Sequence, residues 1–428
     1  MNADQQILTQ LAKEYREVAF APVNEERRAL WKALNGLREC RPLIMMDQLP
    51  WHELDVDGDL KLRCRDADAR IVEDALRKQL YQAKYFPADK VFEPYLELPK
   101  TIEGYHHGVV RREVTLAADE KNDVVSHSYV SQLSSESDLE NLKFPDIRVD
   151  EAKDKKRWEK VSEMVSGILP VRLTGVRMFH CGIWDDLVEA IGTDSFFFTG
   201  VVPVDTPDNL RKIGDFLRDK DEPELLHKAA RRMADICQSL IDQLTEKQLF
   251  DAYEPTVHCT GAYTDELPQD KEKNVRPGDV WTFGLAQMLG SVSPQMFEEY
   301  EVEYVKPLLE QFGLVYYGCC EPLHNRIDYI RKIKNVRKIS MSPWADIRAG
   351  AEHIHGDYVI SRKPTPAYLA AASFDPELVR RELQETCRAA KENGCTCELI
   401  LKDVSTVQYH PERLAQWHKI AVEVAGEW

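Results

Sequence analysis

The C-terminal part of the chain alternates between short apolar runs and segments with helical spacing, and this alternation constrains the fold more than any other feature. The runs of strand length are 314–317, 337–341, 358–361 and 397–402. One helical segment, before the first of these runs, begins at Ser293 and should stop at Gly313, and another, between the last two runs, begins at Asp375 and ends at Gly394. Strands that alternate with helices pair in parallel through crossover connections. We therefore predict an α/β fold around a parallel sheet.

Polar residues follow the predicted strands, which helps to choose between the two common parallel architectures. A doubly wound sheet usually carries a glycine-rich phosphate loop after a strand, and the chain has neither GxGxxG nor GxxxxGK(S/T). The length of 428 residues and the polar strand ends favour a (β/α)8 TIM barrel. In such barrels the active site lies at the carboxyl ends of the strands.

The N-terminal half shows the same periodicities less regularly. Residues 1–40 have helical spacing and are expected to form an extension, so that the barrel covers 41–428. An insertion around 95–150 alternates polar and β-branched residues and is expected to be β-rich or to form long loops. The other predicted elements are strands at 43–46 and 168–174, and helices at 70–86, after Asp205-Thr206-Pro207, and at 223–247.

The net charge narrows the range of partners. The chain has 56 basic and 73 acidic residues, a net charge of −17, so most of its surface should repel nucleic acid and anionic membranes. No apolar run reaches the roughly 18 residues of a membrane span, and the N-terminus does not have the form of a secretory signal. We expect a cytoplasmic protein that binds a small molecule and that could form a homodimer.

Ten cysteines show no spacing typical of a disulfide framework. In the cytoplasm they should be reduced, which leaves some of them available for metal or thiol chemistry. Cys237 and Cys387 lie on the apolar faces of predicted helices, where they are expected to pack as small hydrophobic residues.

Cysteine, histidine and charged residues follow most of the predicted strands. In a barrel these positions surround one mouth, so segments far apart in the sequence are expected to form a single site. The candidates are Asp47, His52, Glu53, His180, Cys181, His258, Cys259, Cys319, Cys320, Glu321, His324, Lys363, Lys402 and Asp403. Lys402 and Asp403 form either an internal ion pair or a catalytic couple.

The segment Gly318–Glu321 is the strongest of these candidates. Successive strand residues point to opposite faces, so one of Cys319 and Cys320 should face the mouth, and the sequence leaves open which. A carboxylate directly after a strand needs a partner or solvent, which makes Glu321 a candidate ligand or acid. Zinc takes thiolate, imidazole and carboxylate ligands, and all three types are present among the strand-end residues.

Several motifs occur together in an order that is familiar from one superfamily. They are the helix start Ser-Pro-x-x-Phe-Glu-Glu-Tyr at 293–300, a strand ending in a cysteine motif, a later strand running into 363–367, and a helix at 26–36 followed by Arg41-Pro42. In these motifs the chain resembles the uroporphyrinogen decarboxylase superfamily, which also contains zinc-dependent, corrinoid-linked methyltransferases. The resemblance implies a (β/α)8 barrel over most of the chain.

Two departures from the family pattern affect the expected chemistry. The decarboxylases have an arginine-rich loop after the first strand, whereas residues 47–53 here are acidic and would repel a polycarboxylate porphyrinogen. The methyltransferases have His-x-Cys after the middle strand, where this chain has Tyr317 in place of the histidine, and residues 402–405 replace their last Gly-Cys turn. A zinc ion would therefore need a rearranged set of ligands, drawn from His258, Cys319, Cys320 and Glu321, with His52 as a further candidate.

The resemblance thus implies a methyltransferase of the O-demethylase type. Such an enzyme moves a methyl group from a methylated or methoxylated small molecule to the corrinoid (cobalamin) of a partner protein. A methyl ether has a poor leaving group, which a metal or a general acid would stabilise. The expected catalytic residues are Glu321, His52, Lys402 and Asp403. The residues expected to bind the donor are Trp51, His180, Trp184, Tyr316 and Lys363.

Two alternatives stay open. The first is a decarboxylase or lyase of the same fold that acts on a smaller acid, and arginines facing the mouth would favour it. Arg362 is the one good candidate for such an arginine. The second alternative is a barrel without catalytic activity that serves in binding or assembly.

Overall fold

A parallel sheet of seven strands forms the centre of the molecule. The computed structural model describes residues 3–105, 112–116, 126–133, 135–165, 167–191, 222–253, 255–268 and 271–428. In order across the sheet, the strands are β1 (Leu43–Met46), β15 (Cys397–Leu401), β14 (Val359–Arg362), β13 (Val336–Met341), β12 (Leu314–Tyr317), β11 (Trp281–Gly284) and β8 (Met178–Cys181). All neighbouring pairs are parallel. The predicted α/β class is therefore confirmed.

Both faces of most strands in this sheet are covered, which is why β1 and β12 read as continuous apolar runs. Every residue of β1, β12, β14 and β15 is buried. The pairing register places Met46 beside Leu401, and Gly284 beside both Tyr317 and Cys181. The residues that follow these positions consequently lie along one edge of the sheet, at the carboxyl ends of the strands.

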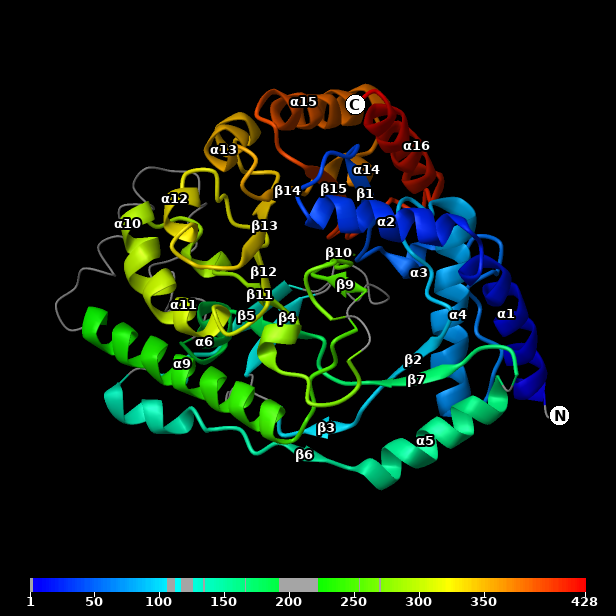
Figure 1. Cartoon of the computed structure of the whole chain (residues 1–428), viewed down its shortest axis with the longest axis horizontal. Coiled ribbons are helices and arrows are strands. Elements are labelled where there is room, and N and C mark those ends of the chain that lie inside the picture. Colours follow the sequence, from blue (N-terminus) through cyan, green and yellow to red (C-terminus); the bar gives the residue numbers. More distant parts are fainter. Residues whose placement is uncertain are drawn as a thin grey trace.

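Helices surround the sheet (Figure 1). The C-terminal ones are α10 (Pro294–Phe297), α11 (Glu303–Leu309), α12 (Ile327–Ile330), α13 (Ile347–Ile354), α14 (Ala367–Ala370), α15 (Pro376–Glu392) and α16 (Glu412–Gly426). The predicted caps are present: the side chain of Ser293 accepts a hydrogen bond from the backbone of Met296 at 3.2 Å, and Asp375 accepts one from Glu377 at 2.9 Å. Among the helices that the structure describes, none combines the length and the apolarity needed to cross a bilayer.

The N-terminal half is also largely as predicted. Its helices are α1 (Ala3–Ala19), α2 (Val23–Asn35), α3 (Trp51–Leu54), α4 (Ala67–Tyr85), α5 (Glu151–Met164), α6 (Ile183–Ile191) and α9 (Glu222–Glu246). The insertion around 95–150 is β-rich in its described parts, with β2 (Leu96–Pro99), β3 (Ile102–Glu103), β4 (Glu113–Leu116), β5 (Ser126–Tyr129) and β6 (Arg148–Val149). The helix expected after Asp205-Thr206-Pro207 lies outside the described residues.

Two predictions about strands need correction. The run predicted as a strand at 168–174 forms β7 (Val171–Thr174), but β7 pairs with β2 in a separate two-stranded sheet. The main sheet instead contains β8, so His180 and Cys181 lie within a strand and not after one. The strand β11, between β12 and β8, is absent from the sequence prediction. Within the described residues, β1 and β8 form the two edges of the sheet, and the eighth strand of a closed barrel stays a prediction.

A short hairpin, β9 (Thr256–Val257) and β10 (Thr260–Gly261), lies near the middle of the view in Figure 1, below α2. At the amino-terminal side, a Cβ atom on Gly261 would lie 2.4 Å from the Trp31 ring of α2, so only glycine allows this approach. Beside it, the buried Nζ of Lys338 lies 2.8 Å from the carboxylate of Glu398 and 3.2 Å from the hydroxyl of Thr260. The hairpin therefore packs against β13 and β15 near the beginnings of these strands.

Candidate active site

A cysteine and a lysine meet over the carboxyl ends of the strands. Cys319 follows β12, and Lys402 follows β15. The Nζ of Lys402 donates a hydrogen bond to the sulfur of Cys319 at 3.4 Å, and both side chains are buried. The left-handed backbone of Gly318 (φ 95°) turns the chain at this point, and a Cβ there would lie 2.3 Å from the Leu323 side chain. Glycine at 318 thus fixes the position of the Cys319 thiol.

The electrostatic surroundings of Cys319 favour a thiolate. A hydrogen bond with Cys320, opposed by burial and aided by the charges of Lys363 and Lys402, lowers the pKa of Cys319 to about 6. Burial would lower the pKa of Lys402, but the negative charges of Cys319 and Asp403 outweigh it and raise that pKa above its ordinary value. The two groups therefore form a thiolate–ammonium pair at neutral pH.

A second lysine holds the backbone beneath this pair. The Nζ of Lys363, which follows β14, donates to the carbonyl oxygen of Cys319 at 2.9 Å. The hydroxyl of Ser340 donates to the same oxygen at 2.7 Å. Burial lowers the pKa of Lys363, because the opposing charge of Cys319 offsets the loss of water only in part. Two lysines from neighbouring strands β14 and β15 thus converge on one cysteine.

His258, in the turn between β9 and β10, completes the cluster. Its Nε2 lies 3.3 Å from the Nζ of Lys363 and 3.5 Å from that of Lys402, and its ring stacks on Phe283 with centroids 3.8 Å apart. Burial, followed by the charges of the two lysines, holds the pKa of His258 well below its usual range, so the imidazole is neutral. His258 and Cys259 form the hairpin turn with φ values of 38° and 68°. Positive φ at both central residues is the ordinary geometry of a two-residue hairpin turn, and this turn carries His258 to the two lysines.

The structure places both cysteines of the predicted motif at the same site. Cys320 is partly exposed, and its sulfur lies 3.6 Å from the sulfur of Cys319 and 3.6 Å from the carboxylate of Asp403. The contact with Cys319, together with burial, raises the pKa of Cys320 well above its ordinary value. Asp403 also lies 3.1 Å from Lys402, so the predicted ion pair between these two residues is present. Cys320 and Asp403 form the solvent-facing side of the cluster.

Glu321 has a positioning role in this arrangement. One carboxylate oxygen accepts the backbone N–H of Cys319 at 2.9 Å, and the other accepts that of Ala286 at 3.1 Å. The neighbouring backbone N–H of Gln287 donates to Asp185 at 3.0 Å. Burial, and then the charge of Glu321, raises the pKa of Asp185 to about 8. Asp185 therefore carries a proton at neutral pH.

The predicted zinc ligands are His258, Cys319, Cys320 and Glu321. Lysine ammonium groups approach the Nε2 of His258 from two sides, and both carboxylate oxygens of Glu321 accept backbone hydrogen bonds. In the part of the chain that the structure describes, no three His, Cys, Asp or Glu side chains come close enough together to hold a metal ion. As placed here, these residues do not fit zinc. Zinc at this site stays a prediction.

Two predicted donor-binding residues lie beside the cluster. The ring of Tyr316 is 5.2 Å from that of His258 and 5.5 Å from the Nζ of Lys363, but its hydroxyl is paired with Ser361 at 2.6 Å. The ring of His180 lies 5.5 Å from that of Phe283. Both residues therefore lie beside the cluster, and the side chain of Tyr316 is fully buried.

Other predicted residues lie apart from the thiolate. Trp184 is buried in the core, where its indole N–H donates to the carbonyl of Tyr300 at 2.7 Å. Trp51 packs against Tyr81 with ring centroids 6.1 Å apart. His52 lies beside the loop that follows β15, with its ring 6.5 Å from that of Tyr409. Packing in the core or at the rim therefore accounts for the positions of these three side chains.

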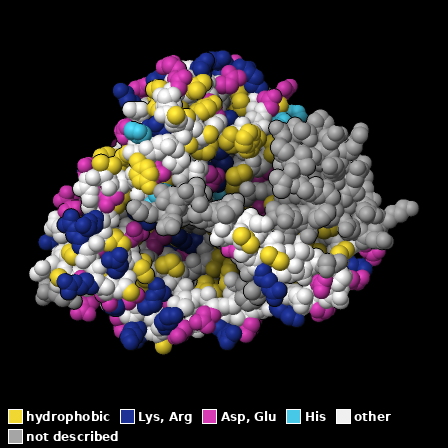
Figure 2. Space-filling view, turned by 180° about the vertical axis from the view of Figure 1, so that it is seen from behind, with side chains coloured by type: hydrophobic (Ala, Val, Ile, Leu, Met, Phe, Trp, Pro, Cys, Tyr) yellow, Lys and Arg dark blue, Asp and Glu magenta, His cyan; other side chains and the backbone are white. Residues whose placement is uncertain are grey.

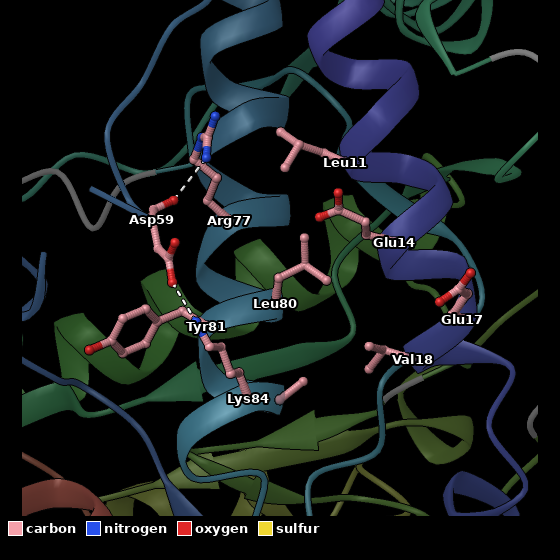
Figure 3. A pocket seen from close by; sticks show the side chains of 10 residues that line it. Leu11, Glu14, Glu17, Val18, Asp59, Arg77, Leu80, Tyr81 and Lys84 are labelled. Carbon is pink, nitrogen blue, oxygen red and sulfur yellow. Dashed lines mark hydrogen bonds and ion pairs between the residues drawn. The ribbon is translucent and has the colours of Figure 1, made fainter. Parts of the chain in front are cut away.

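The molecular surface has a hollow on one face and a groove between two of the helices. Figure 2 shows the face opposite to that of Figure 1, with a hollow near its middle in which acidic and basic side chains are visible. Figure 3 shows a different groove, between α1 and α4, lined by Leu11, Glu14, Glu17, Val18, Asp59, Arg77, Leu80, Tyr81, Ala83 and Lys84. Its basic groups are paired, since Arg77 and Lys84 both donate to Asp59, at 2.8 and 3.0 Å. That groove lies on the helical wall, away from the strand ends.

Two parts of the site are missed by reasoning from the sequence. The strand β11 supplies Phe283 and leads to the backbone N–H groups of Ala286 and Gln287, but Thr282 and Gly284 interrupt its apolar pattern. Asp185 stands in the first turn of a helix, where acidic residues are common for reasons of capping and dipole alone. No signal in the sequence marks either as functional.

The arrangement brings together a nucleophilic sulfur, an ammonium proton donor and a protonated carboxyl group. Such a set can displace a leaving group at carbon and return a proton to it. Comparison with known proteins adds no assignment to this chemistry: no protein-family model matches the chain, and no curated protein matches its sequence.

Proposed function

We propose that the chain is an enzyme that removes a methyl group from a small methylated donor, with Cys319 as the nucleophile and Lys402 as the proton donor. The observation that supports this most directly is the 3.4 Å contact between the Lys402 Nζ and the Cys319 sulfur. The choice of a methyl group rests on the resemblance of residues 293–376 to corrinoid-linked methyltransferases. We also propose that the sheet closes as a (β/α)8 barrel, which would surround this contact on all sides.

The proposed displacement uses the charge of the pair directly. The Cys319 sulfur attacks the methyl carbon, the sulfur–carbon bond forms, and the carbon–oxygen bond breaks with its electron pair on oxygen. The Lys402 ammonium gives its proton to that oxygen, so a neutral alcohol or phenol leaves. Because the charge of Cys319 raises the pKa of Lys402, methylation of the sulfur removes that effect and makes the ammonium a stronger acid. Proton release is thereby coupled to bond cleavage.

The methyl group must then leave the sulfur. The acceptor that the resemblance implies, a corrinoid on a partner protein, would supply a strongly nucleophilic cobalt centre. In this second half of the reaction the sulfur–carbon bond breaks with its electron pair on sulfur, so Cys319 leaves as a thiolate. Lys402, which gave up its proton in the first half, takes a proton from solvent and again balances the charge of the thiolate. Lys363 and Ser340 keep the Cys319 carbonyl fixed through both halves, at 2.9 and 2.7 Å.

The test is a search for the methylated cysteine. The full chain is incubated with a methoxylated aromatic acid that carries a labelled methyl group and is then digested with trypsin. The expected result is one labelled methyl group on Cys319, and formation of methylcobalamin when cob(I)alamin is added. Cys319→Ser should abolish both signals, whereas Cys320→Ser should retain them. Methylcobalamin formation by Cys319→Ser at the rate of the unaltered chain would contradict the proposed role.

A second candidate, a carboxy-lyase acting on a small acid, is supported by one observation. Arg362 does not contribute to it, because its guanidinium is already engaged, donating to Ser342 at 2.7 Å and to Glu382 at 2.9 Å. However, Lys363 and Lys402 place two buried cations next to each other, which would bind a carboxylate. Release of carbon dioxide from small oxo acids, without transfer of a methyl group, would favour this candidate. A chain that is inactive in both assays would favour the remaining alternative, a protein without catalytic activity that serves in binding or assembly.

A further inference from the structure

We propose that Cys319 and Cys320 form a peroxide-sensitive dithiol that closes to a reversible disulfide and switches the site off. The two sulfur atoms lie 3.6 Å apart, and both residues belong to one turn after β12. This modification goes beyond the proposed transfer reaction, and its chemical readout does not require that reaction to take place.

Two contacts and the partial exposure of Cys320 distinguish this pair from the other cysteines. The Lys402 ammonium lies 3.4 Å from the Cys319 sulfur and stabilises its thiolate, the form that peroxides oxidise. Cys320 is partly exposed, so an oxidant can approach from its side. The carboxylate of Asp403, 3.6 Å from the Cys320 sulfur, can accept the proton of that thiol. Reactive cysteines with a second thiol within reach are typical of redox-sensitive sites.

The proposed oxidation proceeds in two steps. First, the Cys319 thiolate attacks one oxygen of hydrogen peroxide, the oxygen–oxygen bond breaks, and hydroxide leaves and takes up a proton to become water. This gives a sulfenic acid at Cys319. Second, Cys320 passes its proton to Asp403 and attacks the sulfenic sulfur, so that the sulfur–sulfur bond forms and the hydroxyl group leaves with a proton as water. Overall, two thiols are oxidised and one peroxide is reduced to two water molecules.

The geometry also makes the product easy to reduce. The sulfur atoms must approach from 3.6 Å to the roughly 2.05 Å of a disulfide, within a ring closed by adjacent residues. Disulfides of strained geometry are reduced more readily than structural ones. The oxidised pair removes both the thiolate and the resolving thiol. The site would therefore be inactive until a cellular dithiol restores it.

Buried cysteines provide an internal comparison. Cys181 forms a hydrogen bond with Cys237, but both are buried in the core, where an oxidant does not reach them. Burial also removes Cys395 and Cys397 from contact with an oxidant. Proximity of two thiols thus occurs elsewhere in the chain, whereas residues 319–320 combine it with a neighbouring ammonium, a partly exposed thiol and a carboxylate.

The experiment uses the reduced, full-length chain and one equivalent of hydrogen peroxide, followed by tryptic digestion. The peptide 274–326 contains Cys319 and Cys320 and no other cysteine, because trypsin does not cleave before Pro277 or Pro307. We expect this peptide to lose two hydrogens and to regain them after dithiothreitol. In Cys320→Ser, dimedone should trap a sulfenic acid on Cys319. In the control Cys40→Ser, which alters another partly exposed cysteine, the disulfide should form as in the unaltered chain.

Three outcomes would overturn the proposal. The first is oxidation of other cysteines before peptide 274–326 changes mass. The second is a dimedone adduct on Cys319 that accumulates equally in the unaltered chain and in Cys320→Ser, which would show that Cys320 does not resolve it. The third is a change in mass that dithiothreitol does not reverse. A chain without methyl-transfer activity that still forms the disulfide would support this inference while contradicting the proposed function.

Discussion

Lys402 and Cys319 lie 3.4 Å apart although their strands, β15 and β12, are separated in the sheet by β14 and β13. The contact therefore spans the two intervening strands and does not link neighbouring ones. The thiolate that the Lys402 ammonium contacts offsets the cost of burying this charge away from water. The reactivity of Cys319 should consequently report on this relationship directly.

Alkylation of Cys319 by iodoacetamide should rise with a midpoint near its pKa of about 6, well below the roughly 8.5 of an ordinary cysteine. Lys402→Met should move the midpoint to higher pH and slow alkylation at pH 6, by about fivefold if the midpoint rises by about one on the pH scale. Lys419→Met, at an exposed position of α16, is the matched control and should leave the midpoint unchanged. Rates are measured by mass spectrometry of peptide 274–326. An unchanged midpoint in Lys402→Met would contradict the thiolate–ammonium pair.

The buried pair of Lys338 and Glu398 should be sensitive to the loss of either partner. Lys338→Met or Glu398→Gln leaves the other group with too few partners, and each should lower the free energy of unfolding by about 3–5 kcal/mol. The double variant Lys338→Met/Glu398→Leu should recover most of this loss. Denaturant midpoints provide the measurement. Lys78→Ala breaks an exposed pair with Asp74 and should change stability by less than about 1 kcal/mol.

Gly318→Ala should disturb the site more than a matched glycine replacement elsewhere. Both Gly318 and Gly394 have left-handed backbone, but a Cβ at 318 would meet the Leu323 side chain, whereas nothing lies within 4 Å of one at 394. Gly394→Ala should therefore cost about 1 kcal/mol from its backbone alone. Gly318→Ala should cost more and should also alter the alkylation rate of Cys319. Equal thermal shifts for the two variants would show that the contact with Leu323 relaxes freely.

The raised pKa of Asp185 predicts a pH dependence of stability. Below its ordinary value of 3.8 the carboxyl group is protonated in both the folded and the unfolded chain, so it has no effect. Between about pH 4 and 8 the folded chain retains the proton and the unfolded chain does not, so the folded state loses stability as the pH rises. Relative to Asp185→Asn, the unaltered chain should thus show a thermal midpoint that falls over this range and then levels off. A constant difference from pH 5 to 8 would contradict the raised pKa.

Treatment with a metal chelator should have little effect on the cluster, since the ammonium groups of Lys363 and Lys402 lie next to the Nε2 of His258. We expect the alkylation rate of Cys319 and the thermal midpoint to be the same before and after treatment with a strong chelator. Elemental analysis of the purified chain measures zinc directly. One zinc per chain, with Cys319 protected from alkylation until the metal is removed, would show that the predicted ligands do rearrange around an ion.

The C-terminal strands could be predicted because most of their residues form short apolar runs that are buried on both faces, even where a polar residue such as Glu398 stands among them. Leu314–Tyr317 is such a run, and its predicted bounds are those observed. The strand Trp281–Gly284 has a threonine and a glycine among four residues, which hides it from any test of periodicity. At 168–174 the apolar run does form a strand, but its pairing with β2 depends on the insertion. Local pattern determines that a strand forms, and tertiary packing determines where it pairs.

The same division between local sequence pattern and tertiary packing applies to the candidate site. Cys319, Lys363 and Lys402 can be found from the sequence because parallel strands bring their carboxyl ends to one edge. Their contacts could not be predicted, since these depend on side chains meeting across several strands. Trp184 is buried although it was expected to bind a ligand, because an aromatic side chain is equally common in a core and in a pocket. Glu321 was expected to act as an acid or ligand, and its orientation toward two backbone N–H groups depends on β11.

The β9–β10 hairpin also connects α2 with the site. Trp31 packs on Gly261 at one end of the hairpin, and His258 touches the two lysines at the other. Displacement of α2 would therefore reach His258, and through it the two lysines beside Cys319, along a short stretch of backbone. A molecule that binds α2 would then alter the surroundings of the Cys319 thiol without entering the site.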